Sequence, residues 1–331
     1  GRLDVLPEGG EPPTDFGSAH LMHERRGVGG DAGTRFFAEG FVGEGRALAR
    51  VLKSFGSGPV IASGVGSTGS GSSFGAVAGT TWSIGGTLAG IRDVGFAIPT
   101  EWSTARSVAA EVEAGWARRA DPGNQGLSLR ARAGLGFDTQ DRQWLRVEAA
   151  GATRRELTPG WQLSLDFFAG GVAGRFGGNS APPERRFSLG SGDAWQTLGN
   201  PLLRSRASLL DQEGWVSGGG TLRGFIPRLT FPWVATAAAT LIGSRRTVAG
   251  YDVRPLVAFG LGTAGAPEAS IAALGHGELL WSLGPGVEIG QPDAPLSLRV
   301  DLPLLMSHPE LAATANDATF GPRLQVGFVR R

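Results

Sequence analysis

Residues 161–170 read Trp-Gln-Leu-Ser-Leu-Asp-Phe-Phe-Ala-Gly, an alternation of apolar and polar side chains. The apolar set is Trp161, Leu163, Leu165, Phe167 and Ala169, and the polar set is Gln162, Ser164 and Asp166. Successive side chains of a strand point to opposite faces, so a period of two predicts a strand with one apolar and one polar face. The rest of the chain is interpreted outward from this segment.

Three segments before it repeat the same pattern at 107–120, 126–138 and 144–157. Their apolar faces carry residues such as Val112, Leu129 and Leu145. Their polar faces carry both signs of charge, from Glu111, Glu113, Arg130, Arg132, Arg146 and Glu148. The connections at 121–124 (Asp-Pro-Gly-Asn) and 158–160 (Thr-Pro-Gly) have the composition of hairpin turns. Consecutive antiparallel strands are therefore expected.

The length of these segments separates two all-β architectures. Strands of soluble proteins are usually about 5–6 residues long, whereas a strand that crosses a bilayer needs about 9–11 tilted residues. A closed barrel also accommodates charged side chains in its lumen, and the nine tryptophans can supply the aromatic girdles at the two membrane surfaces. The pattern favours a transmembrane antiparallel β-barrel, with a soluble secreted β-protein as the alternative.

Composition removes several other classes. The 331 residues include no cysteine, which excludes disulfides and thiolate chemistry. The 31 basic and 30 acidic residues leave a net charge of +1, which gives no reason to expect a nucleic-acid partner. No run of 18 apolar residues occurs, so no transmembrane helix is expected.

The whole chain is predicted to form one barrel of about sixteen strands over 19–331, after a linker at 1–18 that leads into it. The glycine-rich first part predicts strands near 19–28, 33–43, 45–55, 58–66, 74–85 and 87–98. The last part predicts strands near 231–243, 254–264, 278–290, 296–305 and 321–330. Between these parts, 175–225 is a long connection that interrupts the rhythm, and connections of this length are usually functional.

This connection ends at 218–225 with Gly-Gly-Gly-Thr-Leu-Arg-Gly-Phe. Glycine permits turns and close backbone approach, and a polar lumen can hold a charge. We therefore expect a loop tip folded back into the lumen, formed by Gly220, Leu222, Arg223, Gly224 and Phe225. A surface turn with an exposed arginine is the alternative.

The Arg-Gly-Phe tip, the five strands after it and the C-terminal strand resemble the BamA/TamA-like bacterial surface antigen superfamily of outer-membrane assembly and translocation barrels. Two further stretches look like the penultimate hairpin of that family, Leu-Gly-Pro-Gly-Val-Glu-Ile-Gly at 283–290 and Ala-Pro-Leu-Ser-Leu-Arg-Val-Asp-Leu-Pro-Leu at 294–304. The segment 324–327 resembles its closing strand. The resemblance covers about 210–331, and upstream only the strand count supports it.

The resemblance implies that the loop before the twelfth strand lies in the lumen, with its Val-Arg-Gly-Phe-type tip on the inner wall and Leu222 in place of valine. It also implies a barrel in the bacterial outer membrane, surrounded by lipid, that inserts or exports polypeptides through a weak seam between the first and last strands. In this chain the seam strand would contain Leu324, Val326 and Phe328. A client polypeptide and periplasmic or lipoprotein partners are expected.

The chain departs from the family pattern at the expected partner of the motif arginine. Family members set an acidic residue on the thirteenth strand, in a Phe-x-Asp-x-Gly pattern, whereas 259–262 reads Phe-Gly-Leu-Gly. A buried arginine without a partner is costly. The candidates for pairing with Arg223 are therefore the lumen-facing carboxylates Asp166, Glu111 and Glu148.

No catalytic or metal-binding pattern is present in the sequence. His20 and His23 are three residues apart, which places them on opposite faces of an extended segment. Nucleophile-elbow, zinc-protease and phosphate-loop motifs are missing. We expect no enzyme, no cofactor and no metal.

Two further hypotheses stay open. The chain begins at Gly1 without a methionine, so it is expected to be a piece of a longer protein. The barrel would then be a passive pore, or a membrane anchor or exporter for an upstream soluble domain.

Overall fold

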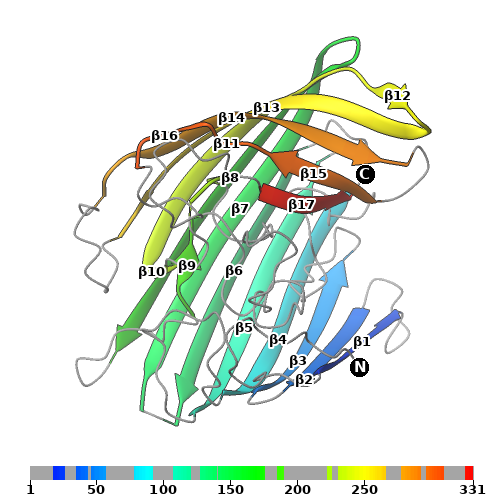
Figure 1. The fold of residues 1–331 in the computed structure, drawn as a ribbon. Coiled ribbons are helices and arrows are strands. Elements are labelled where there is room, and N and C mark those ends of the chain that lie inside the picture. Colours follow the sequence, from blue (N-terminus) through cyan, green and yellow to red (C-terminus); the bar gives the residue numbers. More distant parts are fainter. Residues whose placement is uncertain are drawn as a thin grey trace, which may run out of the picture.

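The computed structural model consists of antiparallel β-strands in the part of the chain that it describes (Figure 1). The described residues are 18–26, 35–43, 46–56, 78–91, 107–120, 127–139, 141–175, 185–189, 222–225, 230–265, 277–291, 296–308 and 325–330. No helix in these ranges has the length and apolar character needed to cross a membrane. The strand expected at 58–66 and the turn expected at 121–124 lie outside the described residues.

Eight strands precede the long connection. They are β1 (Ser18–Arg26), β2 (Arg35–Gly43), β3 (Arg46–Gly56), β4 (Gly79–Ile91), β5 (Ser107–Arg119), β6 (Leu127–Asp138), β7 (Gln143–Thr158) and β8 (Trp161–Arg175). The later strands are β9 (Phe187–Ser188), β10 (Thr230–Phe231), β11 (Trp233–Ile242), β12 (Arg246–Val248), β13 (Tyr251–Ala264), β14 (Leu280–Gly290), β15 (Leu296–Asp301), β16 (Leu305–Met306) and β17 (Gln325–Arg330).

Fifteen of these strands form a single curled sheet (Figure 1). Thirteen follow one another in the order β1-β2-β3-β4-β5-β6-β7-β8-β11-β13-β14-β15-β17, while β12 pairs beside β13 and β16 beside β14. In the described part of the chain β1 pairs with β2 and β17 pairs with β15, so these two strands form the edges of the sheet. The total of about sixteen strands stays a prediction.

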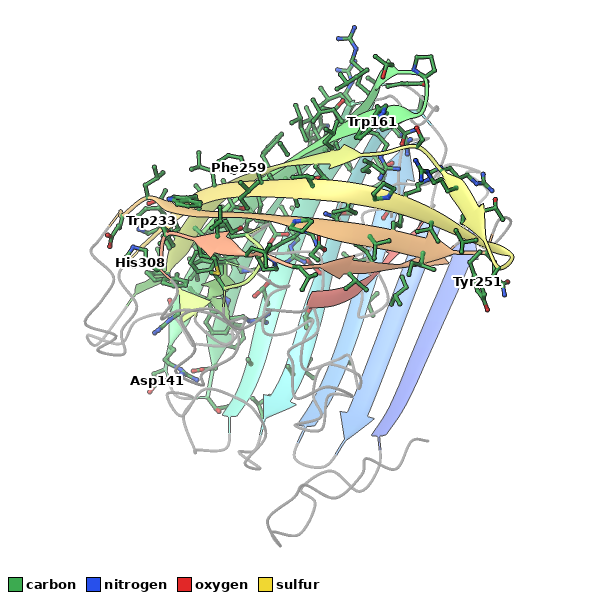
Figure 2. All side chains as sticks on the ribbon, turned by 45° about the horizontal axis from the view of Figure 1, so that its top comes forward. Asp141, Trp161, Trp233, Tyr251, Phe259 and His308 are labelled. Carbon is green, nitrogen blue, oxygen red and sulfur yellow. The ribbon has the colours of Figure 1, made fainter. Side chains whose placement is uncertain are left out.

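The two faces of the sheet differ in polarity as the alternation predicts. On β5 the side chain of Val112 is 63% exposed, whereas the adjacent Glu113 is 3% exposed. The outer face also exposes Leu127, Leu135, Phe137, Leu145, Val147, Trp161, Leu165 and Phe167. Figure 2 shows Phe259 of β13 on this outer surface as well. Such a large apolar surface is unusual for a water-soluble monomer and is typical of a membrane barrel.

The structure differs from the prediction at the glycine pair Gly85 and Gly86. The described parts of the strands expected at 74–85 and 87–98 belong to a single strand, β4, which runs through Gly85 and Gly86. A Cβ atom built at Gly85 would lie 2.2 Å from the carbonyl oxygen of Val51 and 2.7 Å from Cδ2 of Leu52. The glycine therefore serves close packing between strands rather than a turn.

A second difference lies near the C-terminus. The strand expected at 296–305 is divided into β15 and β16 by residues 302–304. The chain stays bonded to β14 across the break, because Leu302 N–H donates to Pro285 O at 2.8 Å and Leu304 N–H donates to Leu283 O at 3.1 Å. Pro303 has no N–H to give to a ladder, which is consistent with an interruption here.

The assignment of the outer face can be tested with arginine at two depths. Leu165 and Leu157 are both exposed on the β7–β8 hairpin, but Leu157 lies close to the Pro159–Gly160 turn. In a membrane, Leu165→Arg should destabilise the folded barrel by about 2–4 kcal/mol and Leu157→Arg by about 0–1 kcal/mol. Equilibrium unfolding in urea with protein in lipid vesicles measures both values. Equal costs for the two variants would contradict the proposed lipid contact.

Candidate functional site

The tip of the long connection, Leu222–Phe225, is buried against the inner face of the C-terminal strands. Leu222 and Phe225 are fully buried, and Arg223 is 8% exposed. Leu222 packs onto β13 where that strand has glycines: a Cβ atom at Gly262 would lie 2.2 Å from Cδ1 of Leu222, and one at Gly260 would lie 3.6 Å from its Cα. These glycines make room for the tip. The tip is docked on the wall, so the alternative of an exposed surface turn does not hold.

Gly224 turns the tip against the break between β15 and β16. Its φ is +88°, a left-handed conformation that favours glycine. A Cβ atom at this position would lie 2.7 Å from Cγ of Pro303 and 3.0 Å from the sulfur of Met306. Both the backbone conformation and the lack of space therefore require glycine here.

The charge of Arg223 is neutralised by Asp301 of β15. Nη1 of Arg223 donates to Oδ2 of Asp301 in a buried ion pair. Arg299, two residues earlier on the same strand, donates from Nε to the same carboxylate at 3.0 and 3.1 Å, and from Nη2 to Thr240 of β11 at 3.3 Å. Asp301 thus lies between two guanidinium groups and joins the tip to the wall.

Arg223 keeps its charge although it is buried. Desolvation by burial is the largest influence, followed by repulsion from Arg299, and together they lower the pKa of Arg223 to about 10. Attraction by Asp301 and Asp166 acts in the opposite direction. The side chain is therefore a cation at neutral pH, and the site depends on its carboxylate partners.

The structure corrects the expected partner of Arg223. Among the three candidates, Asp166 of β8 lies near enough to attract Arg223, and its Oδ2 accepts a hydrogen bond from Ser164 at 3.3 Å. Glu111 of β5 instead pairs with Arg185 of the long connection, and Glu148 of β7 pairs with Arg132 of β6. Asp301 was not among the candidates, although it belongs to the Leu-Arg-Val-Asp run quoted for the penultimate hairpin.

A second part of the long connection, residues 185–189, is docked about Glu111 and Trp144. Oε2 of Glu111 lies 3.2 Å from Nη2 of Arg185 and accepts the indole N–H of Trp144 at 2.9 Å. The guanidinium of Arg185 stands 5.4 Å from the centre of the Trp144 ring. Glu148 does not join this contact and forms ion pairs with Arg132 at 3.1 Å and with Arg146 at 3.0 Å. This anchor was not predicted from the sequence.

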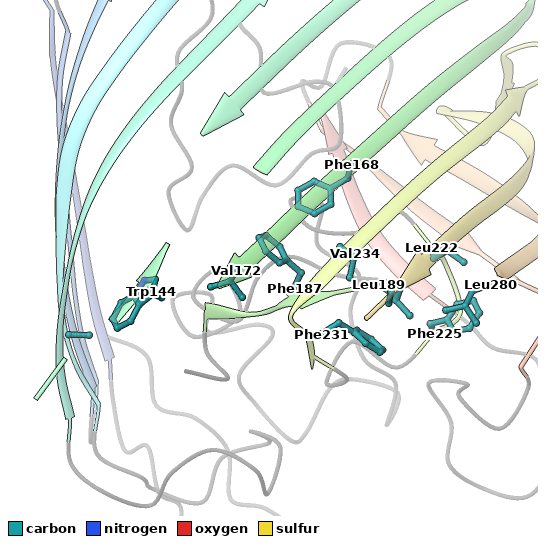
Figure 3. Close-up of a cluster of buried hydrophobic side chains, with 12 residues drawn as sticks. Trp144, Phe168, Val172, Phe187, Leu189, Leu222, Phe225, Phe231, Val234 and Leu280 are labelled. Atoms are coloured by element: carbon teal, nitrogen blue, oxygen red, sulfur yellow. The ribbon is translucent and has the colours of Figure 1, made fainter. Parts of the chain in front are cut away.

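The two docked segments share one apolar cluster (Figure 3). The ring of Phe187 is tilted against that of Phe168 of β8, with their centres 5.6 Å apart. The guanidinium of Arg146 lies over the Phe187 ring, 4.4 Å from the ring centre. Leu189 and Leu222 connect the segments directly, because the N–H of Leu222 donates to the carbonyl of Leu189 at 3.0 Å. A run of Arg-Arg-Phe at 185–187 was the only sequence signal for this contact.

The structure describes only some of the other predicted site residues. Val326 and Phe328 lie on β17 opposite Val300 and Leu298 of β15, whereas Gly220 and Leu324 lie outside the described residues. The described residues hold no group of three or more His, Asp or Glu side chains that could bind a metal ion.

Removing either member of the Arg223–Asp301 pair should have unequal effects. Arg223→Ala leaves Asp301 paired with Arg299, so we expect a loss below about 3 kcal/mol. Asp301→Ala leaves two buried arginines facing each other, so we expect a loss of at least about 3–5 kcal/mol. Urea unfolding and the heat-dependent shift of the folded band on gels measure both, with the exposed Arg246→Ala as control. Two variants as stable as this control would show that the tip is not held by this pair.

The need for glycine in the tip can be tested with a matched pair. Gly224 and Gly250 both have positive φ, +88° and +81°, but a Cβ atom at Gly250 would meet nothing within 4 Å. Gly250→Ala should therefore cost only the left-handed conformation, about 1–2 kcal/mol. Gly224→Ala should cost more, because its Cβ also collides with Pro303. The same unfolding experiment compares them, and a smaller loss at Gly224 would be incompatible with the docked tip.

The chain was compared with known families and structures. No protein-family model and no curated protein sequence matches it. A crystal structure of BamA from Haemophilus ducreyi lacking POTRA domains 1–3 is similar over 94% of this chain, with 13% identity and a TM-score of 0.51. Two CdiB structures, from Acinetobacter baumannii and Escherichia coli, match 89% and 98% of the chain with 12% identity and TM-scores of 0.44 and 0.42.

The chain spans 66% of the BamA chain and 49% and 63% of the two CdiB chains. The BamA match, at 13% identity, shows the fold alone. The predicted fold class is confirmed, and so is the similarity to BamA at the level of the fold: the chain has an antiparallel β-barrel fold like that of the BamA structure.

Proposed function

We propose that this chain is the barrel of a bacterial outer-membrane protein that inserts or exports polypeptides through a seam between its edge strands. The docking of Leu222–Phe225 through the Arg223–Asp301 pair carries the proposal. A simple pore needs no buried arginine, and burying one is costly. A barrel that must hold its C-terminal wall in shape while another part opens has a use for such a clamp.

The docked tip and the arginine–aspartate cluster around it connect strands that are not all neighbours in the sheet. Leu222 contacts Gly262 of β13, Gly224 contacts the residues after β15, and Arg299 connects β15 with Thr240 of β11. A shift of β15 relative to the tip would break the buried Arg223–Asp301 ion pair, and a shift of β11 or β13 would break a hydrogen bond or a packing contact. The C-terminal wall is therefore expected to move as a unit.

The edge strand β17 has a short ladder in its described residues. It pairs with β15 over six residues, Gln325–Arg330, whereas the ladder between β7 and β8 runs from Gln143 to Thr158. The unpaired backbone of an edge strand can pair with an incoming strand. In this proposal Leu324, Val326 and Phe328 line the seam, and the passenger is an extended polypeptide segment.

Lipid and protein partners follow from the same proposal. The apolar outer face would contact the lipids of the outer membrane, where we place the protein. Periplasmic domains or lipoproteins would deliver the client polypeptide.

A passive pore is the second candidate, because the inner face is lined by charged residues such as Glu113, Arg132 and Asp166. Two docked segments of the long connection lie on this face, which favours a plugged barrel. Single-channel recording in a planar bilayer separates the two. Large and steady conductance would favour the pore, whereas small and irregular conductance agrees with the plugged barrel.

Insertion activity can be measured directly. The full-length protein is placed in lipid vesicles, and the folding rate of an added unfolded outer-membrane barrel is followed by its gel shift. We expect at least a tenfold faster rate than in empty vesicles, and a reduced rate with Arg223→Ala but not with Arg246→Ala. If a client folds no faster than in empty vesicles and an added unfolded passenger is not exported either, the proposed function is wrong.

A further inference from the structure

Three aromatic side chains form a row across the outer face of β3, β4 and β5. Phe55 lies directly opposite Trp82, and Trp82 lies directly opposite Trp116. The rings of Trp82 and Trp116 are 6.4 Å apart, and Trp82 is 60% exposed. Tryptophan is enriched where a bilayer meets water, because its ring is apolar and its N–H needs a polar partner.

Two cations flank this row. Lys53 lies two residues before Phe55, and Arg118 lies two residues after Trp116, so each is a diagonal neighbour of Trp82. Both are exposed, and neither makes an ion pair with a described residue. The Nζ atom of Lys53 bends back over the Phe55 ring, 5.0 Å from its centre, toward the end of the strand. A lysine that extends toward the interface while its stem covers apolar surface is typical of a membrane-facing position.

The outer face changes polarity along the strands at this row. Level with Lys53 and farther toward the middle of the sheet, the other outward side chains are apolar. They include Val51, Ile84, Leu88 and Val112, each at least 45% exposed. The aromatic row follows, and Arg118 lies beyond it, next to the strand end at Arg119. On β5 this order of apolar, aromatic and cationic side chains matches the order from hydrocarbon to headgroup in a bilayer. Lys53 lies two residues nearer the middle of the sheet than the row, and its Nζ atom reaches back to the level of Phe55.

The row lies at the end of the sheet with the β7–β8 turn at Pro159–Gly160. Figure 2 shows Trp161 and Tyr251 at this end, and Asp141, Trp233 and His308 at the other. The long connection between β8 and β11 starts from that other end. In bacterial barrels, short turns are periplasmic and long loops are extracellular. The connection 57–78 between β3 and β4 leaves from the row's end, whereas 92–106, 265–279, 307–324 and the long connection all leave from the other end. On this balance the row is assigned to the periplasmic leaflet.

From this arrangement we propose that Lys53, Trp82 and Arg118 form a binding site for the headgroup of an anionic glycerophospholipid. The two cations attract the negatively charged phosphate, and the indole ring lies at the level of the glycerol backbone. The inference rests on the proposed membrane location, and it names a lipid partner that the insertion function does not require. The site would fix the height of β3–β5 in the bilayer.

The experiment has two stages, so that failure of the membrane location is distinguished from failure of the site. Flotation with vesicles first establishes insertion of the full protein. Native mass spectrometry of the folded protein in detergent then measures the Kd for the first phosphatidylglycerol and the first phosphatidylcholine. Each cation near a lipid surface contributes about a fivefold gain in affinity for anionic lipid. The wild-type protein should thus prefer phosphatidylglycerol at least fivefold.

The variants make the assignment specific. The double variant Lys53→Gln with Arg118→Gln should lose the preference, and Lys53→Arg with Arg118→Lys should keep it. Arg246→Gln on β12, an exposed cation on a different hairpin, should also keep it. Three results would overturn the inference if the protein floats with vesicles. They are equal affinity for the two lipids, a loss of preference in Arg246→Gln as large as in the double variant, and tighter binding of lipopolysaccharide than of phosphatidylglycerol. Absence of flotation would instead overturn the membrane location on which it rests.

Discussion

The buried contact between Arg223 and Asp301 is the constraint on which the interior of this barrel depends. A guanidinium group taken out of water must keep a carboxylate partner, because an isolated buried charge costs several kcal/mol. Arg223 of the long connection therefore lies against Asp301 of β15, which is 78 positions later in the chain. Asp301 also holds Arg299 in place, since both cations share one carboxylate.

Glycines make this contact sterically possible. Gly262 removes the side chain that would occupy the position of Leu222, and Gly224 adopts the left-handed backbone that turns the tip toward Pro303. The second anchor, at Arg185 and Phe187, uses the opposite solution, with large side chains filling the inner face around Trp144. The long connection is thus held at two sites, one electrostatic and close-packed, the other largely aromatic.

The outer face is apolar, in contrast to the charged inner face. Its apolar side chains are largely exposed in the described strands, and Val112, Leu135 and Phe137 are more than 60% exposed. In water this surface would drive association, whereas in a bilayer it is the favourable surface. The position of Lys53 and Arg118 next to the aromatic row agrees with an environment that changes along the strand from hydrocarbon to polar headgroups.

The sequence alone determined the direction of most side chains, because alternation with a period of two assigns each residue of a long strand to one face. It also located the tip, since Leu222–Phe225 carries its own glycine and charge. The tertiary structure decided which inward carboxylate meets Arg223. Asp166, Glu111, Glu148 and Asp301 all face inward, and alternation does not distinguish among them. Only the register of the strands and the path of the connection place Asp301 beside the tip, just as close packing on Val51 and Leu52 keeps Gly85 within a strand.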